Sequence, residues 1–107
     1  IIAKFYEKNI NNIKISKLNY SSGCVFHQFV VIVNDINIFI KYLKIHKIPF
    51  GRHYPFAIHQ LTSLKRFFRN QKYPNSERLA KYGISLPIDP CLSKSNLKKI
   101  VKVINKF

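Results

Sequence analysis

The feature that most constrains the fold of this chain is an apolar run at residues 25–33. The run reads Val-Phe-His-Gln-Phe-Val-Val-Ile-Val and is rich in β-branched and aromatic side chains over the length of one strand. A strand with one wet face would alternate apolar and polar residues, whereas this run is nearly continuous. The pattern therefore predicts an interior strand, with His27 as a core histidine whose ring is hydrogen-bonded.

A helix is predicted directly after this strand. Asn34 or Asp35 can cap its start, because both side chains accept hydrogen bonds from the free N–H groups of a helix N-terminus. The positive charge of His46 and Lys47 suits its carbonyl end. Its apolar stripe, at helical spacing, consists of Ile36, Phe39, Ile40 and Leu43.

The last helix has the clearest local signals. Ser93 is its predicted N-cap, and Leu92 and Leu97 stand at the two positions of a hydrophobic staple. The stripe predicted to be buried consists of Leu97, Ile100, Val101, Ile104 and Phe107. The face predicted to lie in water consists of Lys94, Lys98, Lys99, Lys102 and Lys106.

The remaining segments give weaker signals. Residues 1–10 suit the tail of a helix, residues 13–24 are polar and irregular, and residues 61–68 fit a short helix. Asn75 or Ser76 would cap another short helix that closes at Gly83. Residues 84–88 read as an extended segment at a sheet edge or a strand end, because Pro87 cannot donate to a ladder. The predicted fold is a small two-layer α/β (α+β) unit, with the order β-α-(loop)-α-α-β-α.

The composition is that of a single globular domain. The chain has 107 residues, of which 47% are hydrophobic and 14% aromatic. Its net charge is +15, from 19 Lys and Arg against 4 Asp and Glu, a balance compatible with nucleic-acid binding. However, the lysines are spread without a long run, which favours solvated helix faces over a nucleic-acid footprint.

The two cysteines, Cys24 and Cys91, lie far apart in the sequence. We expect buried or idle thiols of a cytosolic protein, and neither a disulfide nor a metal site. No apolar run reaches membrane-spanning length, and the first residues lack the flanks of a signal peptide. Because the chain opens within a helical pattern, it is expected to be a fragment.

Residues 51–60 form the segment most informative about function. Two histidines and a tyrosine follow Gly51 and Arg52 around a fixed bend at Pro55. Titratable groups clustered in a loop are expected to carry binding chemistry. A metal at His53 and His59 would need further ligands, and no carboxylate or cysteine stands nearby in the sequence.

Four segments in order carry a resemblance to a known family. They are residues 2–6 (IAKFY), 26–32 (FHQFVVI), 48–59 (IPFGRHYPFAIH), and 75–80 (NSERLA) with 85–90 (SLPIDP). On these motifs the whole chain resembles the C-terminal part of the sugar aminotransferases of the DegT/DnrJ/StrS family. The departures are small: for example, Ala57 replaces a second proline, and Lys47 stands where the family usually has glycine.

The resemblance implies the small C-terminal domain of a fold-type-I transferase that depends on pyridoxal phosphate. Residues 1–12 would be the end of an interdomain helix and residues 13–107 the small domain. The Schiff-base lysine and the rest of the cofactor-binding domain would lie upstream of residue 1. No catalytic, cofactor-binding or metal residue is therefore expected here, and the fragment alone is expected to be inactive.

The resemblance also implies that the segment around His53 faces the substrate. His53 would donate to a sugar hydroxyl or a diphosphate oxygen, with the alternative that it only holds the loop. Tyr54, Arg52 and His59 are further candidates for substrate binding. For these three, the alternatives are a packing aromatic, a solvated arginine and a structural histidine.

The parent enzyme would transfer an amino group from a donor such as glutamate to a keto-sugar linked to a nucleotide. The resemblance implies a cytoplasmic homodimer in amino-sugar biosynthesis for surface polysaccharide or glycosides, with neither nucleic acid nor membrane as a partner. A related branch that replaces the lysine and carries out dehydration stays open. So do a freestanding basic binding module and a degenerate family member kept for regulation.

Overall fold

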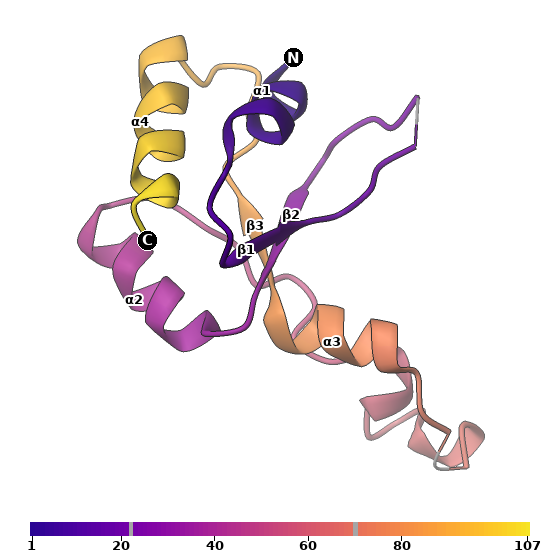
Figure 1. Ribbon diagram of the computed structural model, residues 1–107. Helices are drawn as coiled ribbons and strands as arrows, with labels where there is room; N and C mark the ends of the chain where they lie inside the picture. The colour runs from indigo at the N-terminus through magenta and orange to yellow at the C-terminus, as the bar shows by residue number, and fades with distance from the viewer. Residues whose placement is uncertain (22, 70) are drawn as a thin grey trace.

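The computed structural model describes residues 1–21, 23–69 and 71–107. Its helices and strands, in chain order, are α1 (Ile2–Asn9), β1 (Ile15–Lys17), β2 (Phe29–Val33), α2 (Ile36–Ile45), α3 (Pro74–Tyr82), β3 (Gly83–Leu86) and α4 (Lys94–Asn105). Two 3₁₀ turns, η1 (Ile58–Gln60) and η2 (Lys65–Phe67), lie between α2 and α3. α3 and these turns extend from one end of the sheet, away from α1 and α4 (Figure 1).

Within the described residues, three antiparallel strands form one sheet in the order β1-β2-β3. β2 lies in the middle, so the prediction of an interior strand is confirmed. β3 lies at the edge of the sheet and ends directly before Pro87. This position agrees with the prediction from Pro87, which has no N–H to donate to a neighbouring strand.

Alternation along the strands gives the sheet two different faces. On β2, Phe29, Val31 and Val33 belong to the buried core. Val30 lies on the opposite face, where it pairs with Ser85 of β3. The first face packs against helices, and the second face borders the hollow described below.

The helices that cover the first face follow the predicted stripes. The buried members are Ile36, Phe39, Leu43, Leu97, Ile100, Val101 and Ile104, and the lysines predicted to face water are exposed. The hydroxyl of Ser93 accepts from the N–H of Asn96 at 3.2 Å, which confirms the predicted N-cap of α4. The two-layer prediction of helices on a small sheet is confirmed.

The prediction for His27 is wrong. β2 begins at Phe29, and His27 is exposed in the connection that leads from β1. Val25, in the same connection, is 89% exposed. In the described part of this connection, neither β1 nor β3 pairs with residues 25–28, so these residues lack the neighbouring strands that would bury them.

The boundaries of three other elements differ from the predictions. β1 lies within the segment expected to be irregular, because a strand of three residues with only Ile15 buried leaves no alternating pattern. Residues 61–68 hold the turn η2 instead of an α-helix. α3 begins at Pro74 with Tyr73 as its N-cap, since proline suits the first helical position.

Cys24 and Cys91 are free cysteines, and both are exposed. Of the two expected alternatives, buried or idle thiols, the buried one is therefore wrong. Both stand in connections outside the helices and strands, where no layer of the fold covers them. Among the described residues, no helix is both long and apolar enough to cross a membrane.

Candidate functional site

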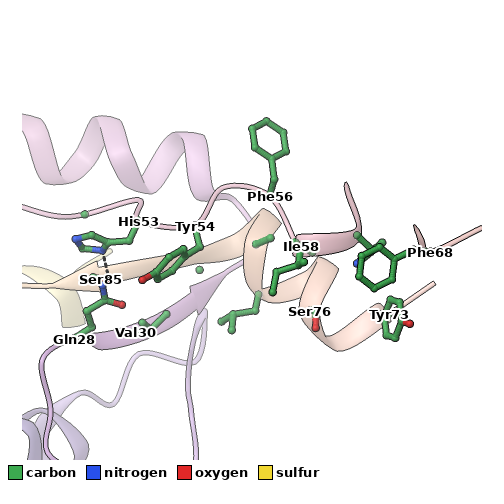
Figure 2. Close-up of a pocket in the computed structure, with 16 residues that line it drawn as sticks. Gln28, Val30, His53, Tyr54, Phe56, Ile58, Phe68, Tyr73, Ser76 and Ser85 are labelled. Carbon is green, nitrogen blue, oxygen red and sulfur yellow. Dashed lines mark hydrogen bonds between the residues drawn. The ribbon is translucent and has the colours of Figure 1, made fainter. Parts of the chain in front are cut away.

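The second face of the sheet opens onto a hollow of about 610 Å³. The segment that follows Gly51 forms one wall, and α3 forms another. The lining residues are Gln28, Val30, Gly51, His53, Tyr54, Phe56, Ala57, Ile58, His59, Phe68, Tyr73, Ser76, Leu79, Ala80, Gly83 and Ser85. His53 and Ser85 stand at one end of the hollow, and Phe68 and Tyr73 at the other (Figure 2). Three of the four predicted site residues, His53, Tyr54 and His59, therefore line a single hollow.

His53 is exposed, and its side chain is hydrogen-bonded to that of Ser85. Its Nδ1 lies 3.1 Å from the Oγ of Ser85, drawn as a dashed line in Figure 2. Ser85 is itself only 7% exposed. The histidine thus presents one ring edge to the sheet and keeps the rest available to a ligand.

Tyr54 follows along the same wall. It is 73% exposed, and its ring centroid lies 6.5 Å from that of His53. A tyrosine so exposed is not a core aromatic, so the packing alternative finds little support. Its ring offers an apolar surface, and its hydroxyl can donate or accept.

His59 stands deeper, with a side chain only 9% exposed. Its Nε2 lies 2.9 Å from Oε1 of Glu77, and its ring lies 4.9 Å from that of Tyr73 and 6.1 Å from that of Phe68. A carboxylate therefore does stand beside His59 in space, although none is near it in the sequence, because the fold brings α3 against the loop. These contacts support the structural alternative for His59.

Glu77 lies in the first turn of α3, where its carboxylate accepts two hydrogen-bond contacts. Its Oε1 also accepts the backbone N–H of Tyr73, the N-cap residue, at 3.0 Å. The N–H of Tyr73, and then the side chain of His59, lower the pKa of the Glu77 carboxyl. Among the described residues, no group of three or more His, Cys, Asp or Glu is arranged to hold a metal ion.

Arg52 does not line this hollow. Its Nη2 donates to the carbonyl oxygen of Ala80 at 2.9 Å, in the last turn of α3. It borders a second hollow, together with Arg78 and Lys81. The guanidinium therefore satisfies a helix-end carbonyl, and a phosphate contact by Arg52 stays a prediction.

Two residues that contact the predicted histidines, Ser85 and Glu77, were not among the predicted site residues. A signal existed for each. Ser85 stands between two apolar residues of a strand, so alternation places it on the opposite face. Glu77 lies in the first helical turn after Pro74, where an acid can reach back to the N-cap N–H.

The hollow is suited to binding, and it does not fit the role of holding pyridoxal phosphate. A pyridoxal-phosphate site needs a lysine for the Schiff base and an acid for the pyridine nitrogen. None of the described residues that line the hollow is a lysine, an aspartate or a glutamate. Most of the lining is apolar, with a few hydroxyl, amide and imidazole groups. Such a lining suits a ligand that has a ring to pack on the apolar surface and oxygen atoms to hydrogen-bond with the polar groups.

The fold is a small α+β unit in which one face of the sheet, the segment after Gly51 and α3 surround a single hollow. The chain belongs to the DegT/DnrJ/EryC1/StrS aminotransferase family, whose profile matches residues 1–105. The family predicted from the four sequence segments is therefore confirmed.

One relative in sequence is the dTDP-3-amino-3,6-dideoxy-alpha-D-galactopyranose transaminase of Aneurinibacillus thermoaerophilus. It is 29% identical over 108 residues, which cover 99% of this chain and 30% of the relative. The chain thus spans less than a third of the length of the curated relative it matches.

Solved structures share the fold. A DegT DnrJ EryC1 StrS aminotransferase from Brucella abortus matches with a TM-score of 0.83 and 23% identity, over 98% of this chain and 29% of that chain. DesV of S. venezuelae, solved with a ketimine intermediate, has a TM-score of 0.82 at 19% identity, with coverages of 98% and 29%. NtdA of Bacillus subtilis, with bound PMP, has a TM-score of 0.78 at 16% identity, with coverages of 96% and 26%.

Proposed function

We propose that this chain is the small C-terminal domain of an aminotransferase acting on nucleotide-linked keto-sugars, and that its hollow faces the sugar. The observation that carries the proposal is the gathering of His53, Tyr54 and His59 around one hollow of about 610 Å³. Membership of the aminotransferase family supports the reaction, and the name of the Aneurinibacillus relative supports the class of substrate.

In this proposal the lining residues bind and orient the substrate. His53, exposed and near the mouth, donates to a sugar hydroxyl or a diphosphate oxygen. The ring of Tyr54 packs on a face of the ligand. His59, tied to Glu77, contributes mainly by holding the loop against α3.

The amino transfer itself would be carried by pyridoxal phosphate held by protein outside these residues. The described residues that line the hollow supply neither the lysine nor the acid that such a cofactor needs. On this proposal residues 1–12 end an interdomain helix and residues 13–107 form the small domain. The family also suggests a cytoplasmic homodimer, an amino donor such as glutamate and a role in amino-sugar biosynthesis.

The exposed apolar side chains near the hollow fit docking onto a larger domain. Tyr54, Phe56, Ile58 and Phe67 are each more than 60% exposed. Apolar surface gathered at one end of a small domain is typical of a contact with other protein. This exposure supports the view that the hollow is one half of a larger site.

The test uses the protein expressed from the uninterrupted reading frame that contains these residues. His53→Asn should raise the KM for a dTDP-linked keto-sugar about tenfold, the effect of one lost hydrogen bond to a ligand. The matched control is His46→Asn, at the exposed C-terminal end of α2, which should leave KM unchanged. An unchanged KM in His53→Asn would contradict the placement of the sugar at this hollow.

A further inference from the structure

We propose that Ser85 is a positioning residue for His53. Its hydroxyl donates to Nδ1 of His53 and so directs the Nε2–H of the ring toward a ligand oxygen. The inference rests on the proposed function for the identity of that ligand. The arrangement of the two residues rests on the structure of this chain alone.

The first support is the backbone pairing next to Ser85. Gly51 and Ser85 exchange both backbone hydrogen bonds, at 3.1 and 2.9 Å, in an antiparallel bridge. On its other side, Ser85 pairs with Val30 of β2. Ser85 is therefore fixed between two neighbouring backbones, and the segment that leads to His53 starts from one of them.

The second support is the close approach of the His53 ring to Gly51. A Cβ added at Gly51 would overlap Cε1 of the ring, and it would lie only 2.9 Å from both ring nitrogens. Such a Cβ cannot coexist with this ring position. A side chain at position 51 would therefore force the ring to move. Gly51 leaves the space that this ring position needs, and Ser85 holds the imidazole there by its hydrogen bond.

The direction of the hydrogen bond follows from the burial of Ser85. Its hydroxyl has one proton to donate, and Nδ1 of His53 is its recorded partner among the described residues. If Nδ1 carried the proton instead, the buried Ser85 hydroxyl would have no acceptor for its own proton. A buried donor without an acceptor costs more free energy than a hydroxyl oxygen that leaves one lone pair unused. The neutral ring therefore carries its proton on Nε2.

This orientation has a consequence for recognition. Nε2 lies on the far side of Cε1 from Nδ1 and is a donor in this form, so the site selects a ligand that offers an oxygen acceptor. A carbonyl, hydroxyl or phosphate oxygen of a nucleotide sugar meets this requirement. Because the ring is held before binding, less conformational entropy is lost when the ligand arrives.

The arrangement can be tested by NMR on histidine rings in the protein. A nuclear Overhauser effect between the Gly51 Hα protons and the His53 Hε1 proton should be present, because Cε1 faces Gly51. It should be lost in Ser85→Ala and retained in Ser16→Ala, an exposed serine on the other edge strand. Nitrogen-15 shifts should show a single Nε2–H form in the wild type and a mixture of tautomers in Ser85→Ala.

A second variant, at Gly51, also disturbs the position of the His53 ring. Gly51→Ala keeps the hydroxyl of Ser85 but places a methyl group where Cε1 lies, so the ring should again lose its fixed orientation. Persistence of the nuclear Overhauser effect in Ser85→Ala, or its absence from the wild type, would overturn the positioning role. A single tautomer with the proton on Nδ1 in the wild type would overturn the direction of the bond.

Measurements of KM and kcat distinguish a failure of the positioning role of Ser85 from a failure of the proposed function. In the protein made from the uninterrupted reading frame, Ser85→Ala should raise the KM for the dTDP-linked keto-sugar about three- to tenfold, with a smaller change in kcat. Ser16→Ala should leave both constants unchanged. If the ring moves as expected but neither Ser85→Ala nor His53→Asn changes KM, the proposed function fails while the positioning stands. If KM changes while the ring stays fixed, the positioning fails.

Discussion

The Nε2 of His59 lies 2.9 Å from Oε1 of Glu77, and this contact ties the loop of the hollow to the first turn of α3. The same oxygen accepts the N–H of Tyr73 at 3.0 Å. One carboxylate therefore caps a helix and holds a loop, although the two segments are 18 positions apart in the sequence. Glu77→Ala should loosen both, which faster hydrogen exchange at the amides that begin α3 would report.

The charge of Glu77 predicts a dependence of stability on pH. The N–H of Tyr73 and the side chain of His59 lower the folded-state pKa of this carboxyl below its ordinary 4.5. The stabilisation is therefore fully present above pH 4.5 and is lost as the pH falls through the lowered pKa. Urea unfolding of the wild type and of Glu77→Gln should show a difference in free energy that shrinks with falling pH.

The control for this titration is Glu7→Gln, the same substitution at an exposed acid on α1. Its unfolding curves measure the effect of removing an exposed acid from the same chain, and the Glu77→Gln curves are compared with them. Parallel curves for the wild type and Glu77→Gln from neutral to acid pH would contradict the role assigned to the carboxylate.

A second prediction concerns the attachment of α1. Tyr6 is fully buried, its hydroxyl donates to the carbonyl of Pro87 at 2.7 Å, and burial raises the pKa of that hydroxyl. Tyr6→Phe keeps the ring but leaves a carbonyl without its donor, so the free energy of unfolding should fall by about 1–2 kcal/mol. Tyr54→Phe, at an exposed ring, should change it by less than about 0.5 kcal/mol. Equal effects in chemical denaturation would contradict this assignment.

The sequence was most informative where the signals are local. Ser93 and the stripe through Leu97 and Ile104 define α4 completely, because a cap and a helical period need only neighbouring residues. β1 could not be found in this way, since its existence depends on pairing with β2 and its three residues carry no period of their own. The exposure of His27 has the same cause, because an apolar run does not reveal where its partners end.

In the candidate site, too, the residues that are close in sequence could be predicted and their distant partners could not. His53, Tyr54 and His59 could be nominated from the sequence because they cluster in one short loop. Their partners could not, because Ser85 and Glu77 lie 32 and 18 positions away from the histidines they contact. The resemblance predicted the family, which is confirmed, and a loop that faces the substrate, which stays a prediction. It did not predict the contacts that hold the loop.

A third prediction tests the core under α4. Ile104 is fully buried, so Ile104→Ala should lower the free energy of unfolding by about 2–5 kcal/mol, through lost apolar contacts and the cavity left behind. Lys102→Ala, at an exposed position two residues earlier on the same helix, should stay within about 0.5 kcal/mol of the wild type. Urea denaturation with a common m-value measures both, and a small loss in Ile104→Ala would contradict the packing described here.

The last prediction distinguishes the two roles considered for Arg52. The guanidinium donates to the carbonyl of Ala80, one of the helix-end carbonyls of α3 that lack a partner within the helix. Arg52→Ala should therefore lower the free energy of unfolding by about 1.5 kcal/mol and speed hydrogen exchange at the end of α3. Its KM for a dTDP-linked keto-sugar should change less than that of His53→Asn.

The matched control is Arg78→Ala, an exposed arginine on α3 that borders the same second hollow. Arg78→Ala should leave hydrogen exchange at the end of α3 unchanged. Among the described residues, it is the side chain of Arg52, and not that of Arg78, that donates to a carbonyl at this helix end. A tenfold rise in KM for Arg52→Ala with unchanged stability would favour the phosphate contact instead, since a lost charge-assisted bond to a ligand costs about that much.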